Sequence, residues 1–545
     1  MDVSFILPFF RLIFRAGYDI ISYHKMKTLI MNGTIVDGSG KDAFRGDVLV
    51  EGEKILAVER KIAEADCQRV DATGKLVTPG FIDAHTHSDA YLVIEPDAPS
   101  KLSQGITTEI NGQCGGSVAP RFGEARLSSD WASVLGDKLT WRSLAEYREV
   151  LSAARPAVNT VQFIGHNTLR SSVVGYAGRA ASEDELKAME RMLEKSLDEG
   201  GYGLTTGLIY QPGKYSTPEE VRRLAQVTAR KGGFYATHMR SEGDRILEAI
   251  DEVLELVEAT GIRAEISHLK TSGRRNWGKI DAVLDKLEGA IAKGRVLGSD
   301  RYPFCAAGTD LDVVFPDWAG EGAAKAECER LADPTLRAKI VAEIDALDRD
   351  WQTVMIGGTW DDSTRAYSGK RVSEIMAETG LGAGETVCRI LERDQCRTGA
   401  FFFGMSEDNL DQILSRDWIV PGSDASLRAP WGVLGRDHPH PRAYSTMPEF
   451  LRRCRALGLG LEKVVARMTD VPARRFELSG RGRLEAGYFA DVIVWDENGF
   501  KGNATYLKPH QFASGMEMVM VNGTVSYLAG RFTGQRNGKF LERKP

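Results

Sequence analysis

The sequence predicts an α/β protein: a (β/α)8 TIM-like barrel with a small β-sandwich domain built from both chain ends. Between residues 76 and 421, short apolar strand patterns alternate with amphipathic helix patterns about eight times. This repetition favours a closed barrel over an open sheet. Alternating strand patterns separated by Gly and Asp occur before this region and return after it, which indicates one β-domain assembled from two distant segments.

The β-domain is predicted over residues 26–78 and 481–545. Asn522-Gly523 is a hairpin signal between its last two strands. Its expected strands are 28–35, 47–50, 54–58, 69–71, 487–495, 516–521 and 524–527.

The barrel is predicted over residues 79–480. Helices are expected at 218–231 and 244–260. The segment from about 310 to 417 exceeds one crossover helix, so we expect it to hold a lid or insertion. The expected barrel strands are 76–82, 106–110, 160–164, 202–208, 233–237, 263–267, 295–299 and 418–421.

Residues 1–25 do not resemble a folded element. Their apolar run is broken by Pro8 and Arg11, is too short to span a bilayer, and lacks a small-residue cleavage site. We expect an extension outside the fold, with Met26 as the natural start. A segment that touches a membrane surface is the alternative.

Composition narrows the possible partners and compartment. The 545 residues are 42% hydrophobic and 27% charged with a net charge of −6, as in ordinary soluble proteins, so neither nucleic acid nor membrane is expected as a partner. The seven cysteines are odd in number and lack CxxC spacing, which indicates free thiols and a cytoplasmic location. Composition leaves open whether the chain is a monomer or a homo-oligomer.

The most informative segment is Asp83-Ala84-His85-Thr86-His87, which follows an apolar strand. Side chains alternate along a strand, so His85 and His87 point to one side. Two adjacent imidazoles can bind a metal ion. Two polar residues at a turn are the alternative, which a lone histidine would favour but this pair does not.

Three further polar residues follow predicted barrel strands. His238 and His268 each come after an apolar approach and a small hydroxyl residue. Asp424 follows the last strand, where a carboxylate can bind metal and act as a general base on water. Capping a helix is the alternative role for Asp424.

These residues resemble the amidohydrolase superfamily and, within it, the D-aminoacylases (N-acyl-D-amino-acid deacylases), over about residues 26–532. Many amidohydrolases carry a carboxylated lysine after strand four, but this chain reads Thr205-Thr206-Gly207-Leu208-Ile209-Tyr210 there. Instead, Asn111-Gly112-Gln113-Cys114-Gly115 after strand two is similar to the D-aminoacylase signature. A buried inert thiol is the alternative for Cys114.

The resemblance implies a zinc site. Cys114, His238 and His268 would bind Zn²⁺ tightly. His85 and His87, with Asp424 and a bridging Cys114, would form a second, weaker site. Asp424 would also serve as the general acid and base.

The resemblance also implies substrate contacts. Arg442, in a Pro-His-Pro-Arg loop, would bind the substrate α-carboxylate, assisted by Lys270 and Tyr302, with Tyr210 nearby. Two departures bear on substrate preference. Phe304 replaces the usual second tyrosine, and Gly308 stands where the family often has serine, beside Thr309. His166 is expected either to face the substrate pocket or to be structural.

The expected reaction is zinc-dependent hydrolysis of an N-acyl-D-amino acid to a carboxylate and a free D-amino acid. The nearest alternative is hydrolysis of a related amide: an N-carbamoyl compound, a cyclic ureide or a D-containing dipeptide. Arg442 and Lys270 argue against ureides, which lack an α-carboxylate. A catalytically silent scaffold is disfavoured because all six candidate metal-binding residues are retained. The preferred side chain and acyl group remain open, with a hydrophobic side chain as the default.

Overall fold

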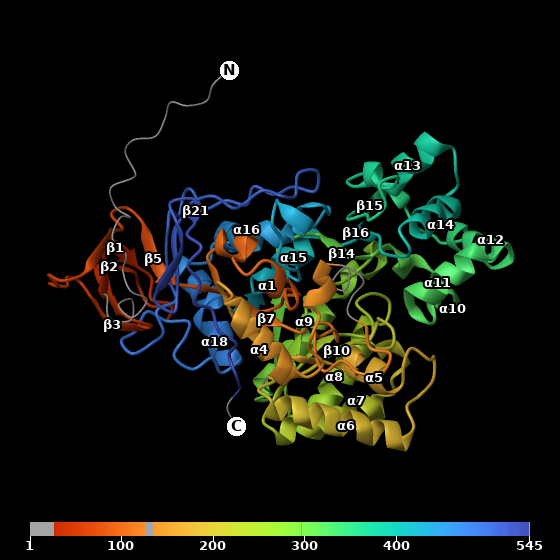
Figure 1. Cartoon of the computed structure of the whole chain (residues 1–545), viewed down its shortest axis with the longest axis horizontal. Helices are drawn as coiled ribbons and strands as arrows, with labels where there is room; N and C mark the ends of the chain where they lie inside the picture. Colours follow the sequence, from red (N-terminus) through yellow and green to blue (C-terminus); the bar gives the residue numbers. More distant parts are fainter. Residues whose placement is uncertain (1–26, 127–133, 296, 544–545) are drawn as a thin grey trace.

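The computed structural model describes residues 27–543, apart from 127–133 and 296. A barrel occupies the centre, with the β-domain at one end and an inserted helical region at the other (Figure 1). The predicted extension at residues 1–25 lies outside the described residues. Within the described part of the chain, no helix is both long and apolar enough to cross a bilayer.

The barrel wall consists of parallel strands, as predicted. Two hydrogen-bonded groups, β6-β7-β8 and β9-β10-β11-β12-β13-β17, form its parts. The ring closes between β17 and β6, where the Ala84 amide donates to the Pro421 carbonyl (3.1 Å) and Thr86 pairs with Ala425. The strands are β6 (Phe81–Asp83), β7 (Ile106–Asn111), β8 (Asn159–Gln162), its continuation β9 (Ile164–Gly165), β10 (Gly203–Gly207), β11 (Phe234–His238), β12 (Arg263–Ile266), β13 (Leu297–Arg301) and β17 (Ile419–Pro421).

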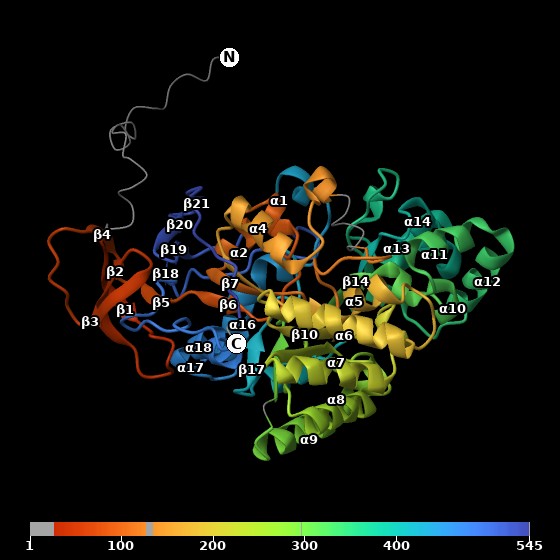
Figure 2. The same ribbon diagram turned by 60° about the horizontal axis from the view of Figure 1, so that its bottom comes forward.

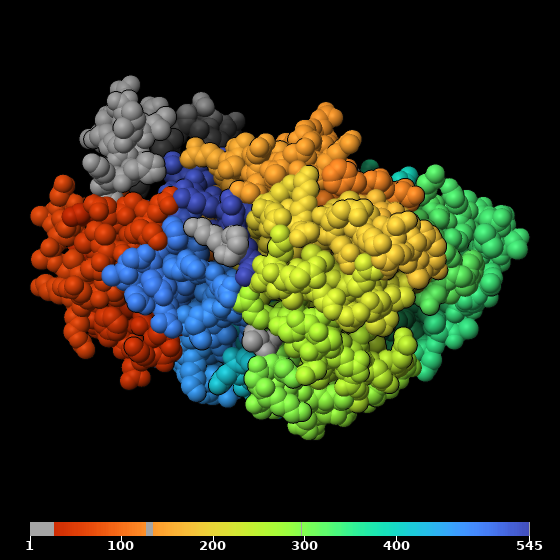
Figure 3. Space-filling model, turned by 90° about the horizontal axis from the view of Figure 1, so that it is seen from below, coloured from red at the N-terminus to blue at the C-terminus, as the bar shows by residue number. Residues whose placement is uncertain are grey.

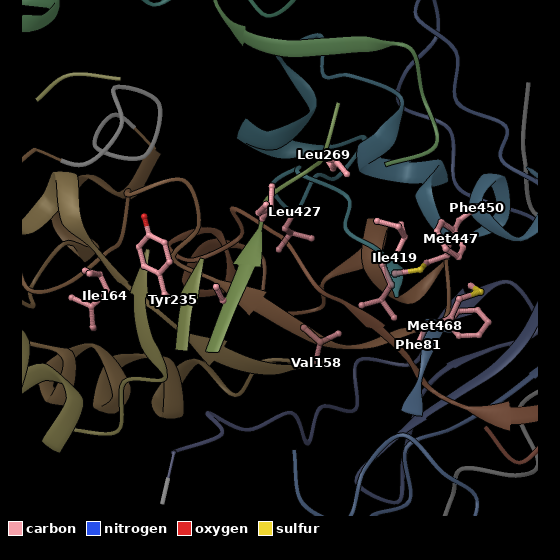
Figure 4. Close-up of a cluster of buried hydrophobic side chains, with 14 of the residues drawn as sticks. Phe81, Val158, Ile164, Tyr235, Leu269, Ile419, Leu427, Met447, Phe450 and Met468 are labelled. Atoms are coloured by element: carbon pink, nitrogen blue, oxygen red, sulfur yellow. The ribbon is translucent and has the colours of Figure 1, made fainter. Parts of the chain in front are cut away.

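Amphipathic helices cover the outside of the barrel, and α6 to α9 lie side by side along one flank (Figure 2). Helix α7 begins as the sequence predicts: Thr217 caps its first turn and Pro218 occupies the first helical position. Apolar side chains of strands and helices form the core shown in Figure 4. The main barrel helices are α4 (Leu144–Ala154), α5 (His166–Val173), α6 (Glu183–Asp198), α7 (Pro218–Arg230), α8 (Ile246–Thr260), α9 (Ile280–Ala292), α15 (Glu407–Leu414), α16 (Arg442–Ala456), α17 (Leu461–Met468) and α18 (Asp470–Arg475).

The β-domain is one nine-stranded sheet assembled from both chain ends, which lie against each other in Figure 3. Strand β5 joins the halves because it pairs with β1 on one side and β18 on the other. Both halves contribute to one apolar core that includes Ile30, Val50, Val494 and Met520. The strands are β1 (Lys27–Ile35), β2 (Phe44–Glu51), β3 (Lys54–Glu59), β4 (Gln68–Asp71), β5 (Leu76–Pro79), β18 (Val492–Trp495), β19 (Met516–Val521), β20 (Thr524–Leu528) and β21 (Arg531–Phe532).

The sequence predicted one barrel strand over the apolar run 76–82, and this prediction is wrong. It divides at Gly80 into β5, in the β-domain, and β6, in the barrel. The amide of Gly80 donates to the carbonyl of Asp491, whereas the next amide donates to that of Gly105 (both 2.9 Å), so the backbone changes partners here. Continuous hydrophobicity could not reveal this change, because both strands are fully buried.

An inserted region lies between β13 and β17. Its small antiparallel sheet has the order β14-β16-β15 and begins at Ala306, slightly before the predicted start near 310. Helix α15, inside the predicted 310–417 segment, instead packs Leu410 and Leu414 into the barrel core. The region comprises β14 (Ala306–Asp310), α10 (Asp317–Gly320), α11 (Ala323–Ala332), α12 (Pro334–Asp345), β15 (Val354–Ile356), α13 (Val372–Thr379), α14 (Ala383–Arg393) and β16 (Gly399–Phe403).

Gly80→Ala tests the junction between barrel and β-domain. A Cβ at this position would overlap the buried Thr107 side chain, so we expect destabilisation of about 1–3 kcal/mol. Gly289→Ala in α9 is the matched control, since its Cβ would meet no atom within 4 Å. Denaturant unfolding measures both variants. An unchanged unfolding midpoint for Gly80→Ala would contradict the tight junction.

Candidate metal centre and active site

The barrel topology brings the predicted chemical residues to one end. His238 is the last residue of β11, and the others follow the carboxyl ends of neighbouring strands. Because these strands are parallel, their ends meet at the same rim. The residues brought together are His85, His87, Cys114, His238, His268 and Asp424.

The Cys114 thiol is the centre of this cluster. Its Sγ lies 3.3 Å from His268 Nε2, 3.4 Å from His85 Nε2 and 3.7 Å from His238 Nδ1. A tetrahedral zinc ion has bonds of about 2.3 Å to sulfur and about 2.0 Å to nitrogen, which places those ligands about 3.5 Å apart. The donor set and its spacing therefore fit zinc.

Two groups of possible ligands share this sulfur. Cys114, His238 and His268 form one group, in which all donor atoms lie within 4.8 Å of one another. The other group, by the same criterion, is His85, His87, Cys114 and Asp424. These two groups contain the same residues as the two sites that the family resemblance implied, and their different affinities stay a prediction.

Three of these residues have an unfavourable backbone conformation. Cys114, His268 and Asp424 have φ angles of 52°, 40° and 48°, in the left-handed region that disfavours non-glycine residues. Each costs about 1 kcal/mol or more, and such strain concentrates at functional sites. The side chains of His268 and Asp424 both approach the Cys114 sulfur.

Neighbouring charges favour the ionised form of the thiol. Burial alone would raise the Cys114 pKa, but the charges of His85 and His268 outweigh it and lower the pKa well below its usual value. A thiolate is the form of cysteine that binds metal. Burial would lower the His87 pKa, yet hydrogen bonds to Asp424 and Cys114 raise it to about 9.

Asp424 lies between the histidines and an arginine. Its Oδ1 is 3.0 Å from His87 Nε2 and 3.4 Å from His85 Nε2, and its Oδ2 is 2.8 Å from Arg442 Nη1. Burial would raise the Asp424 pKa, but the cations of Arg442 and His268 lower it well below its usual value. No described helix begins directly after Asp424, so helix capping does not explain it.

Two carboxylates that were not predicted as site residues support the histidines. Asp300 accepts from His85 Nδ1 (3.0 Å) and from the His268 amide (3.1 Å). Glu242 Oε1 lies 2.9 Å from His268 Nδ1, and its Oε2 lies 3.6 Å from His238 Nε2. The only sequence signal for Glu242 is its position four residues after His238.

The substrate-binding candidates fall into two groups. A cavity of about 460 Å³ opens over the cluster, and Tyr210 and Arg442 line it together with Thr309 and Phe401 of the insertion. Lys270 and Tyr302 are not among the described residues that line this cavity. The Lys270 ammonium contacts Glu242 and lies 2.8 Å from His268 Nδ1. Lys270 therefore pairs with Glu242 beside His268 in this structure.

Tyr302 packs beneath Arg442, whose guanidinium lies 4.7 Å from the ring centre. Burial would raise the Tyr302 pKa, but the cations of Lys270, Arg301 and Arg442 lower it. Arg442 also donates to the Gly308 carbonyl (3.3 Å), so the position that lacks the family's serine lies beside this arginine.

His166 is buried and does not line the cavity. Its Nε2 lies 2.8 Å from Glu220 Oε1, a contact between α5 and α7 that favours the structural alternative.

A family model described as the amidohydrolase family matches residues 68–527 of this chain. The chain belongs to the amidohydrolase family. Within this family it is similar to the D-aminoacylase of Alcaligenes xylosoxydans xylosoxydans, with 34% identity covering 94% of this chain and 97% of that protein. It also has 34% identity to the N-acyl-D-glutamate deacylase of the same organism, and this match covers 95% of this chain and 97% of that protein.

Solved structures agree with these relatives. A D-aminoacylase crystal structure matches with a TM-score of 0.80 and 32% identity, covering 95% of this chain and 99% of that one. The structure of the N-acyl-D-glutamate deacylase of Bordetella bronchiseptica, complexed with zinc and a phosphonate inhibitor, also matches. Its TM-score is 0.80 at 31% identity, and the match covers 95% of this chain and 100% of that one. The D-aminoacylase resemblance recognised in the sequence is confirmed.

Glu242→Gln tests the carboxylate behind the metal ligands. Loss of its charge weakens the support of His268, so we expect metal affinity to fall about 10–100-fold. Glu252→Gln is the control, because Glu252 pairs with Arg240 outside the ligand set. Competition with a chromogenic chelator measures both affinities. Unchanged affinity in Glu242→Gln would exclude this role.

Proposed function

We propose that this protein is a zinc-dependent deacylase that hydrolyses N-acyl-D-amino acids to a carboxylate and a free D-amino acid. The observation that carries the proposal is the convergence of Cys114, His238 and His268 beside the Asp424–Arg442 pair. Relatives of near-full-length coverage named for this activity support it.

Cys114, His238 and His268 would hold one zinc ion tightly. When bound, zinc polarises an amide carbonyl and lowers the pKa of water toward about 7. His85, His87 and Asp424, with the shared Cys114, would hold a second ion more weakly. A structure of a D-aminoacylase is described as showing one-metal activation and second-metal attenuation, which is consistent with unequal sites.

Asp424 would move the proton. Its ionised carboxylate faces the cavity above the thiol, so it can accept a proton from the attacking water. The same group would then return that proton to the leaving amine nitrogen. The low Asp424 pKa keeps the carboxylate in its basic form at neutral pH.

Arg442 would bind the substrate α-carboxylate. It is buried at the cavity wall, and its Nε and Nη1 have no aligned hydrogen-bond partner in the structure, although Nη1 lies 2.8 Å from Asp424. A carboxylate ligand would give this guanidinium an aligned partner. This arrangement favours an acyl-amino acid over a cyclic ureide.

A cytoplasmic location is part of the proposal. All seven cysteines, each within the described residues, are free thiols, and Cys328 and Cys396 remain unbonded with their sulfurs 3.7 Å apart. A reducing compartment maintains such thiols. The expected partner is the small-molecule substrate.

A substrate screen tests the function. N-acetyl-D- and N-acetyl-L-amino acids with apolar and acidic side chains would be assayed with zinc-loaded enzyme, beside N-carbamoyl-D-amino acids, hydantoins and D-containing dipeptides. We expect hydrolysis of the acetylated D-isomers and little of the L-isomers. Turnover of hydantoins alone would overturn the proposal.

Asp424→Asn removes the proposed base. We expect zinc to be retained, because the tight ligands are unchanged, and kcat to fall about 10²–10⁴-fold. Asp437→Asn is the control: this carboxylate lines the same cavity but pairs with Arg428, so its loss should affect kcat far less. Steady-state kinetics and metal analysis provide the measurement. Near-wild-type kcat in Asp424→Asn would exclude it as the base.

Arg442→Met removes the proposed carboxylate anchor. We expect KM for acyl-D-amino acids to rise by the equivalent of roughly 2–5 kcal/mol, since the substrate charge loses its buried partner. Arg397→Met, in the same cavity, is the control and should change KM much less. If the Arg397 variant alone raises KM, the substrate carboxylate binds at the insertion instead.

A further inference from the structure

A buried lysine lies beneath the loop that carries Asp424. Lys101, in the short helix α2 (Pro99–Leu102), is fully buried, and its Nζ is 3.0 Å from Asp83 Oδ2 and 3.0 Å from Glu109 Oε1. Removing such an ion from water costs several kcal/mol even when it is paired. A buried ion cluster is therefore weak evidence for stability, which raises the question of what this one does.

The remaining contacts of this ammonium are with the loop that carries Asp424. Lys101 Nζ donates to Ser423 Oγ and to the Ala425 carbonyl, each at 3.2 Å. These residues directly precede and follow Asp424. Two of the four close polar contacts of the ammonium thus go to the loop, and the other two go to Asp83 and Glu109.

The two carboxylates extend the same attachment. Asp83 Oδ1 accepts from the Ser423 amide (2.7 Å), so it binds the loop as well as the lysine. Glu109 accepts from Ser88 Oγ (2.6 Å), which in turn accepts from the Leu427 amide (3.0 Å). The cluster therefore connects β6, β7 and the loop after β17.

This attachment lies where the barrel is weakly joined. The described contacts between β17 and β6 are isolated, such as the Asp424 amide bond to the His85 carbonyl (2.8 Å). Asp424 itself has a left-handed backbone with φ 48°. A strained residue keeps its conformation only when its surroundings impose it.

We propose that Lys101 is a positioning residue for catalysis: it fixes the backbone on both sides of Asp424 and so holds that carboxylate over the metal centre. Lys101 is absent from the described lining of the cavity and acts only through the loop. The inference rests on the deacylase function proposed above. A misplacement of about 1 Å at a reacting group can cost about 10²-fold in rate.

The experiment compares Lys101→Met with Lys75→Met in zinc-loaded, full-length protein. Lys75 is the control, because its Nζ also lies 3.0 Å from two carboxylates, Asp496 and Glu517, but in a partly exposed ion pair of the β-domain. For Lys101→Met we expect kcat to fall at least about tenfold, with KM within about twofold and zinc per chain unchanged. Lys75→Met should keep wild-type kinetics.

Several outcomes would overturn the positioning role. These are wild-type kcat in folded Lys101→Met, a fall in kcat matched by a proportional loss of zinc, or an equal fall in Lys75→Met. If Lys101→Met does not fold, Ser423→Ala removes the hydroxyl that accepts from Lys101 and leaves the three charges in place. A lower kcat at constant KM then supports the role, and an unchanged kcat overturns it. Wild-type enzyme that fails to hydrolyse any acyl-D-amino acid would instead refute the proposed function.

Discussion

The site depends on the approach of one thiolate to three imidazoles. Cys114, His85, His238 and His268 come from four different strand ends, and without an ion their polar atoms would compete for few partners. His238 Nδ1, 3.7 Å from the sulfur, is the nitrogen placed to share an ion with it. A bound metal ion would hold the thiolate and the neutral imidazoles together in this arrangement.

Buried charged residues around the site support both the imidazoles and the loop that carries Asp424. Asp300 and Glu242 orient the imidazoles, and the lysine cluster at the β17–β6 junction supports the loop of Asp424. The inserted region contributes Thr309 and Phe401 to the cavity wall, so the space above the metal centre is shaped by a part of the chain outside the barrel. The cavity wall is therefore built by the barrel and the insertion together.

Much of this arrangement was predictable from the sequence. Barrel strands and their terminal histidines leave local signals, because hydrophobic runs and the residues that follow them are contiguous in the chain. Long-range partners leave none: Glu242 and Lys101 read as ordinary charges until the fold places them beside His268 and Asp424. The division of the strand at Gly80 was also hidden, since β5 and β6 are equally apolar. Lys270 was predicted to bind the substrate carboxylate, whereas in the structure its ammonium contacts Glu242 and His268.

X-ray absorption at the zinc edge of the enzyme loaded with one metal ion identifies the atoms bound to that ion. If Cys114 is a ligand, the spectrum contains one sulfur at about 2.3 Å together with imidazole nitrogens at about 2.0 Å. A spectrum that contains only nitrogen and oxygen ligands would contradict this assignment, because Cys114 would then lie outside the metal centre.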